Sequence, residues 1–244
     1  MVIWAIARRE LLAQFTTPLA WLVLAAWTFV TNLAFVVALP GEDAYSTLPL
    51  YMESLRTGHM VLLLLAPALT MNSFASEHQQ GTMQLLLTVP VSELQLIAGK
   101  YLAAVLLFLV LIAATLVQPT VLYFVSDLGG MHLLSGYLGL VMLCLFLAAL
   151  GIWISLLALN PVAAYVITFG LLLGLALLGL LADDSAGGAT GLFASLGRGF
   201  GLGPRFAGFV RGMPRLADIA WFLAMTLGCL VLAHGSLRAR RTHG

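Results

Sequence analysis

Long runs of apolar residues, separated by short polar stretches, dominate the chain. A stretch of about 20 predominantly apolar residues is long enough for an α-helix to cross the hydrocarbon core of a bilayer. By this criterion the sequence predicts six membrane spans, at residues 19–39, 55–74, 101–125, 133–159, 162–182 and 218–237. The second of these is the most polar, and it contains Pro67. A neighbouring helix is expected to satisfy the backbone groups that this proline frees.

The longest polar interruption, at residues 76–99, lies between the second and third spans. It contains two Ser-x-x-Gln spacings, beginning at Ser76 and Ser92, which are typical of helix starts capped by a hydroxyl and an amide. Between them, Gly81 is expected to begin a short helix with an apolar side. Pro90 would end that helix, because its ring excludes the preceding residue from the helical region. The pattern therefore predicts a short amphipathic helix that bends into the third span.

Two further segments do not fit the pattern of a span. Residues 1–17 carry an apolar stripe at helical spacing and are expected to lie as a helix in the membrane interface. Residues 183–217 are rich in glycine but contain apolar patches, which favours half-helices that enter the outer leaflet and return. This outer segment contains four arginines, Arg198, Arg205, Arg211 and Arg215. Guanidinium groups bind phosphate and carboxylate, so we expect these arginines to contact anionic headgroups, either as an anchor or as a site for an exported lipid or glycan.

Charges at the two ends of the chain set the expected orientation. Arg8 and Arg9 precede the first span, and Arg238, Arg240 and Arg241 follow the last. The positive-inside rule therefore places both termini in the cytoplasm, which an even number of spans allows. Residues 76–99 are then cytoplasmic. We predict a multi-pass membrane protein with both termini on the cytoplasmic side.

Composition agrees with this class and argues against several others. Hydrophobic residues make up 61% of the chain and charged residues 9%, with a mean hydropathy of +1.05, more than a soluble domain could bury. The net charge of +1 and the dispersed basic residues give no surface for nucleic acid. Both cysteines lie in apolar runs, and no histidine has a second ligand at helical spacing, so we expect no metal site. No nucleophile, base and acid can be grouped, so no catalytic residues are predicted.

Three polar side chains lie within or beside the predicted spans: Asn32, Asn72 and Gln118. Such groups line a transport pathway or bond neighbouring helices, and we favour the second interpretation. A pathway with so few polar groups suits a lipid-like or amphipathic substrate better than an ion. Gly170-x-x-x-Gly174 allows close helix approach, which we assign to packing within the chain rather than to a dimer contact.

A longer pattern surrounds the polar interruption: Phe74-x-x-Glu77-His78-x-x-Gly81-Thr82-x-Gln84-Leu85-Leu86-Leu87-x-x-Pro90-Val91-Ser92, closing on Gly99-Lys100. It resembles the cytoplasmic segment between the second and third spans of type-2 ABC exporter permeases. In that family the segment is a coupling helix that docks into a groove of a separate ATPase. The resemblance implies that ATPase coupling depends on Glu77, His78, Gly81, Thr82, Gln84, Leu85 and Pro90.

A second stretch, Phe206-x-x-Phe209-x-Arg211-Gly212 followed by Asp218-x-x-Trp221-Phe222, resembles the gliding-motility-type branch of this family. The resemblance implies an all-α permease subunit that couples ATP hydrolysis by two ATPase copies to substrate export, with ATP and Mg²⁺ held by those partners. It also implies a second permease copy or a related permease, and an auxiliary membrane protein with a large periplasmic domain. The alternatives are a mechanical transducer that acts on an envelope partner without cargo, and a non-transporting scaffold or enzyme.

Overall fold

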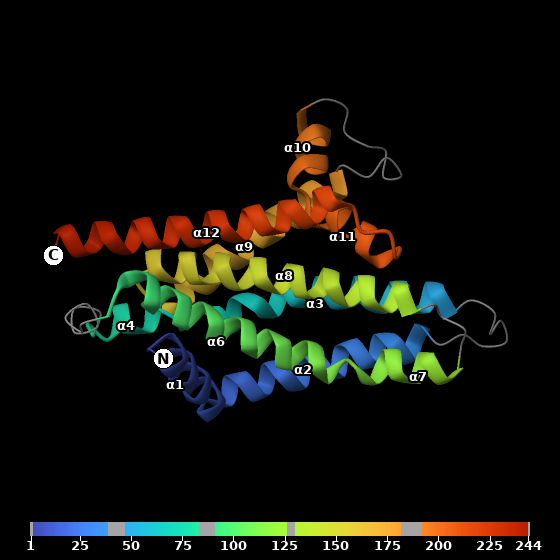
Figure 1. Cartoon of the computed structure of the whole chain (residues 1–244), viewed down its shortest axis with the longest axis horizontal. Coiled ribbons are helices and arrows are strands. Elements are labelled where there is room, and N and C mark those ends of the chain that lie inside the picture. Colours follow the sequence, from blue (N-terminus) through green and yellow to red (C-terminus); the bar gives the residue numbers. More distant parts are fainter. Residues whose placement is uncertain (1, 39–46, 83–90, 126–129, 182–191, 244) are drawn as a thin grey trace.

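The computed structural model describes residues 2–38, 47–82, 91–125, 130–181 and 192–243. Within these ranges every regular element is a helix, and the long helices run along one axis of a bundle (Figure 1). The helices are α1 (Val2–Thr16), α2 (Pro18–Ala38), α3 (Thr47–Thr70), α4 (Ala75–Gln79), α6 (Glu93–Ala114), α7 (Val117–Val125), α8 (Gly130–Leu157), α9 (Pro161–Leu181), α10 (Leu192–Phe200), α11 (Leu202–Val210) and α12 (Leu216–His243).

Six helical stretches of the described chain are long and apolar enough to cross a membrane, which confirms the predicted class of all-α multi-pass membrane protein. They are Pro18–Val37, Ser54–Gln79, Glu93–Val121, Gly130–Leu157, Pro161–Leu180 and Leu216–Ala239. The helices extend beyond the apolar runs from which the spans were predicted. In particular, α6 begins at Glu93 and α3 at Thr47, because polar residues at the membrane boundary continue a helix as readily as apolar ones.

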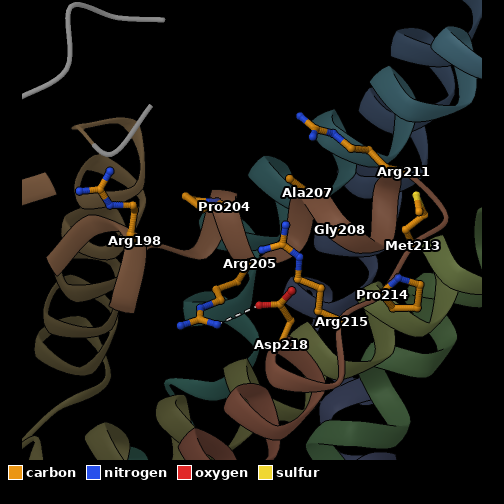
Figure 2. A pocket seen from close by; sticks show the side chains of 10 residues that line it. All are labelled: Arg198, Pro204, Arg205, Ala207, Gly208, Arg211, Met213, Pro214, Arg215 and Asp218. Atoms are coloured by element: carbon orange, nitrogen blue, oxygen red, sulfur yellow. Dashed lines mark hydrogen bonds and ion pairs between the residues drawn. The ribbon is translucent and has the colours of Figure 1, made fainter. Parts of the chain in front are cut away.

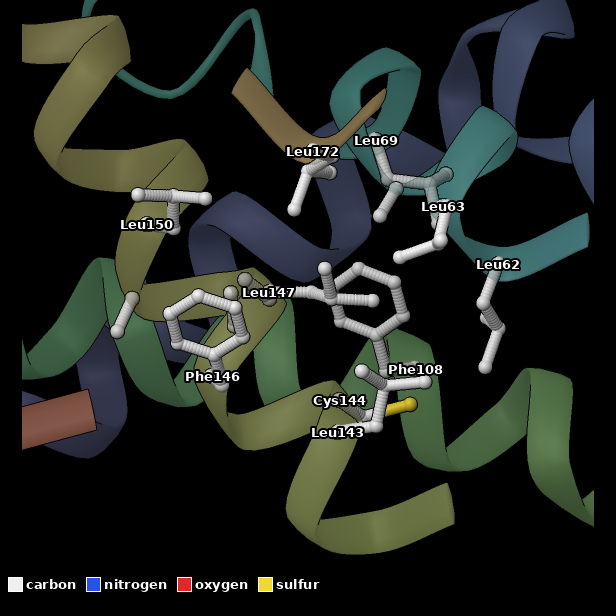
Figure 3. Close-up of a cluster of buried hydrophobic side chains, with 14 of the residues drawn as sticks. Leu62, Leu63, Leu69, Phe108, Leu143, Cys144, Phe146, Leu147, Leu150 and Leu172 are labelled. Carbon is white, nitrogen blue, oxygen red and sulfur yellow. The ribbon is translucent and has the colours of Figure 1, made fainter. Parts of the chain in front are cut away.

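Helix α8 is the centre of the bundle. It packs against α3, α6, α9, α11 and α12, and most of its side chains from Ser135 to Leu156 are buried. Figure 3 shows Phe146 and Leu147 of α8 beside Phe108 of α6 and leucines of α3. The outer helices α2, α9 and α12 instead expose many apolar side chains, as helices that face lipid or another subunit do.

The predicted third span, residues 101–125, is not one continuous helix. It is divided into α6 and α7 at Thr115, because Pro119 has no N–H to donate to the Thr115 carbonyl four residues before it. The hydroxyl of Tyr137, on α8, donates to that carbonyl at 3.0 Å. The N–H of Gln118 also donates to this carbonyl, at 3.0 Å, so the carbonyl at the break has one partner from α7 and one from a neighbouring helix.

The prediction for Gly170 and Gly174 is wrong. A Cβ added at either position would meet nothing within 4 Å, so these glycines do not serve close packing with other described parts of the chain. Close approach is found elsewhere, at Gly151 of α8, where an added Cβ would collide with the side chain of Thr70 of α3.

The bundle has two distinct ends. Both termini, α1 and α4 lie toward one end of the long axis, which we term the proximal end, and α7 and α11 lie toward the other, the distal end (Figure 1). The short helices α10 and α11 account for part of the predicted outer half-helices, and residues 182–191 of that segment lie outside the described ranges.

Candidate functional site

A cluster of charged side chains lies inside the proximal end. Its centre is Lys100 of α6, the only lysine of the chain and only 3% exposed. The Lys100 Nζ lies 3.0 Å from Oε1 of Glu10 on α1 and 2.9 Å from Oε1 of Glu77 on α4. It also donates to the carbonyl of Ser73 and lies 4.7 Å from the centroid of the Phe74 ring. We call Glu10, Glu77 and Lys100 the charge cluster.

The charge cluster joins three elements that are distant in sequence. Two carboxylates share one ammonium, so the cluster carries a formal charge of −1. The side chains of Glu10 and Glu77 are 19% and 16% exposed, so both charges are largely removed from water. Separating the members of a buried ion pair costs much free energy, because it leaves a buried charge without a partner. The second carboxylate oxygen of Glu77 is buried and has no hydrogen-bond partner among the described residues.

Helix α1 reaches the charge cluster by packing directly on α6. Gly99 makes this possible, because a Cβ at this position would lie 2.7 Å from Cγ2 of Ile6. Ala7 is fully buried, whereas Trp4, on the predicted apolar stripe, is 58% exposed. The helical form predicted for the N-terminus is confirmed, and its position in the membrane interface stays a prediction.

The start of α4 is fixed by a residue of another helix. The Oγ of Ser155, on α8, accepts from the backbone N–H of Phe74 at 3.0 Å and of Ala75 at 3.1 Å, and it donates to the carbonyl of Met71 at 2.8 Å. The prediction that Ser76 caps this helix is wrong: its hydroxyl donates to the Asn72 carbonyl. A serine of α8 therefore holds the bend that presents Glu77.

Gly81 and Thr82 form the turn that ends α4, and the short helix predicted to follow them falls on residues 83–90, outside the described ranges. Gly81 has a φ of +69°, a conformation that glycine adopts at little cost. Its N–H donates to the His78 carbonyl at 3.1 Å, and the N–H of Thr82 donates to the Glu77 carbonyl at 3.0 Å, the two bonds of a glycine helix terminus. The predicted residues Gln84, Leu85 and Pro90 lie outside the described ranges.

The second predicted helix start is confirmed. Ser92 and Gln95 form a complete capping box at the beginning of α6, with bonds of 3.3 and 3.2 Å. Near the same end, Nδ1 of His234 on α12 lies 3.9 Å from Oε2 of Glu93.

Two of the three polar candidates inside the bundle meet. Gln118 accepts from the hydroxyl of Ser54 at 2.6 Å and donates to Asn32 at 3.4 Å, which joins α2, α3 and α7. Asn72 is not part of this chain of bonds; it is exposed at the proximal end. The geometry of Asn32 and Gln118 is that of hydrogen bonding between helices.

All four predicted arginines line one cavity toward the distal end, together with Asp218 (Figure 2). The cavity lies between α10, α11 and the start of α12 and has a volume of about 740 Å³. Helix α11 is held against α8 by a 2.8 Å bond from the Ser135 hydroxyl to the Phe209 carbonyl.

The comparisons with known proteins bear on the proximal site. The model of a family described as ABC-2 family transporter protein matches residues 58–194, more than half of the chain. The chain belongs to the ABC-2 transporter family. It is therefore the membrane-spanning permease component of an ABC transporter, and the family implies an ABC ATPase as its partner. Among curated proteins, none matches the permease.

The matched range contains Glu77, Lys100 and Ser155, but neither Glu10 nor the arginines of the cavity. Sequence reasoning missed Glu10 and Ser155 and treated Lys100 only as the end of a motif. The sequence does contain an indication that Lys100 is paired, since a lysine at the edge of an apolar run needs a partner when it is buried. Nothing in the local sequence marks Ser155, whose partners lie about 80 positions earlier.

Proposed function

We propose that the permease exports a lipid-like or amphipathic substrate, and that ATPase subunits drive it through the segment 76–99. The charge cluster carries this proposal. It links α4, which belongs to that segment, to α1 and α6 through contacts of about 3 Å around one buried nitrogen. A displacement of α4 by a docked ATPase would therefore move α1 and the third span with it.

The charge cluster also divides the roles of the predicted coupling residues. Glu77 faces inward to Lys100, and Gly81 and Thr82 shape the end of α4. In the proposal, His78, Gln84 and Leu85 supply the contact with the ATPase, and Pro90 sets the direction of the chain. ATP and Mg²⁺ are bound by the partner.

The rest of the assembly follows from the family resemblance and the exposed helices. Two permease copies, or this chain and a related permease, would enclose the pathway, with two ATPase copies on the cytoplasmic side of a bacterial inner membrane. Both termini would be cytoplasmic, as the terminal arginines favour. Assignment to the gliding-motility-type branch, with its auxiliary periplasmic protein, belongs to the same proposal.

The interior supports the substrate class. Three polar groups inside the bundle, Asn32, Ser54 and Gln118, bond to one another, and the buried imidazole of His59 has an Nε2 without a hydrogen-bond partner among the described residues. Apolar side chains dominate the remainder of the core. An ion would need a row of free polar groups in place of its hydration shell, whereas an amphipathic molecule would not.

Co-purification tests the ATPase contact. The tagged permease is isolated in mild detergent from its own host, and bound proteins are identified by mass spectrometry. We expect a near-stoichiometric ABC ATPase, lost in the variant Leu85→Arg. Met131→Arg serves as the matched control, because Met131 is 78% exposed at the start of α8, at the opposite end of the bundle. An ATPase that remains bound to Leu85→Arg as well as to the control would contradict the assigned contact.

A further inference from the structure

The distal cavity has an unbalanced charge. Four arginines and one aspartate line it, which gives a formal charge of +3. Only one of these arginines is neutralised within the described chain: Nη1 of Arg205 lies 2.9 Å from Oδ1 of Asp218. In Figure 2, Arg211 and Arg215 lie on one side of the cavity, and Arg198, on α10, lies apart from them on the other side.

Arg205 and Asp218 form the frame of this cavity. The Asp218 carboxylate is 8% exposed, and Arg205 also donates to the Gly199 carbonyl at 3.1 Å and lies 5.7 Å from the Trp221 ring. These contacts join α10, α11 and α12. The pair therefore fixes the positions from which the other arginines reach the cavity.

The remaining three arginines have no ion-pair partner among the described residues. Each is exposed, so each guanidinium is free to bind an anion. Guanidinium groups suit phosphate, because their planar pairs of N–H donors match two phosphate oxygens at once. A volume of about 740 Å³ accommodates a phosphate ester together with its neighbouring groups.

The start of the sixth span indicates where the cavity lies relative to the apolar part of the bundle. The span begins at Leu216, directly after Arg215, so we expect Arg215 at the boundary between the hydrocarbon core and the headgroups. Met213 and Leu216 beside Arg215 are 77% and 84% exposed, and Leu227, farther along α12, is 62% exposed. An anion bound in the cavity would thus have apolar surface available for an attached chain.

We propose that the distal cavity binds the phosphate group of an anionic amphiphile. Arg211 and Arg215 are its ligands, Arg198 adds positive charge at the opposite wall of the cavity, and the Arg205–Asp218 pair is the frame that positions them. A simple lipid anchor would need only basic residues spread along the interface, and it would not need a framed cavity. The site goes beyond the transport proposal and does not depend on the ATPase contact.

The test measures lipid binding to the purified permease. The protein is placed in nanodiscs of phosphatidylcholine with a small fraction of phosphatidylglycerol, and retained phosphatidylglycerol is quantified by native mass spectrometry. We expect retention to weaken about fivefold in each of Arg211→Gln and Arg215→Gln. Arg56→Gln is the matched control, because Arg56 is an exposed arginine that does not line the cavity. It should retain the lipid as the wild type does.

Two further arms separate this site from its alternatives. Asp218→Asn makes the cavity more positive but removes the ion pair that positions the arginines. If the arginines bind the lipid as a positioned site, this variant should bind phosphatidylglycerol more weakly. If the cavity attracts the lipid only through its net charge, the variant should bind it more tightly. Excess inorganic phosphate should not displace the lipid, because it lacks the apolar chain. Displacement of the lipid by free phosphate would show that the cavity binds a soluble anion, and it would overturn the proposal that the ligand is an amphiphile. Equal losses in Arg56→Gln and Arg211→Gln, or tighter binding by Asp218→Asn, would overturn the site itself.

Discussion

Replacing Lys100 by Met tests the charge cluster directly. Methionine keeps the length and the unbranched shape of the side chain and removes its charge. The carboxylate oxygens of Glu10 and Glu77 both lie about 3 Å from the lysine nitrogen, so they are at most about 6 Å apart. At an effective dielectric constant of about 20, two negative charges at this separation repel by about 3 kcal/mol.

In the wild type the charge of Lys100 outweighs this repulsion. In Lys100→Met the repulsion is left uncompensated, which should lower the stability of the permease measurably. For a chain of this size, about 3 kcal/mol corresponds to a melting temperature lowered by about 6–12 °C. The assay is thermal unfolding in detergent, followed by tryptophan fluorescence. Arg9→Met is the control, because it removes one positive charge from an exposed position beside Glu10. We expect its melting temperature to match that of the wild type.

A compensated variant separates charge from shape. Adding Glu10→Gln and Glu77→Gln to Lys100→Met removes all three charges, and such neutral replacement of a buried ion cluster is often close to neutral for stability. The triple variant should therefore recover most of the lost melting temperature. The electrostatic account of the cluster is wrong if Lys100→Met has the melting temperature of the wild type. It is also wrong if the melting temperature of the triple variant is no higher than that of Lys100→Met.

Three smaller predictions concern glycines and a cap, each checked by the same thermal assay. Gly81→Ala should cost about 1–2 kcal/mol, because alanine is strained at the positive φ of this position. Gly99→Ala should destabilise by about 1–3 kcal/mol by pushing Ile6 of α1 away from α6, whereas Gly170→Ala, which meets nothing within 4 Å, should not destabilise. Ser155→Ala should cost about 1–3 kcal/mol by leaving the backbone groups at the start of α4 without partners; an unchanged melting temperature would contradict the assigned cap.

Features set by neighbouring residues were predictable from the sequence. The capping box at Ser92 depends on residues three positions apart, and the spans depend on the local density of apolar side chains. The interruption within the third span was not predicted, although Pro119 is visible in the sequence. A criterion based on the length of apolar runs gives proline little weight. It also cannot show that the Tyr137 hydroxyl lies within hydrogen-bond distance of the Thr115 carbonyl.

Features set by distant residues could not be predicted in this way. The Ser-x-x-Gln spacing at Ser76 looks like that at Ser92, yet Ser155 occupies the position that a local cap would have taken. The same holds for Glu77, which was expected to contact a partner protein and whose Oε1 is bonded to Lys100. A spacing motif shows where a charged residue occurs in the sequence. Which partner its side chain faces depends on the helices that pack around it.

The charge cluster also has a consequence for biosynthesis. Glu10 precedes Lys100 by 90 residues, so at about 5–20 residues per second a ribosome needs about 5–20 seconds to supply the partner of Glu10. Ser155 follows later still. Until then α1 has no docking site, and the bend before α4 has no cap. In the proposed coupling, the surface offered to the ATPase would therefore be completed only after the fourth span has been made, so the permease would be inserted first and the ATPase recruited afterwards.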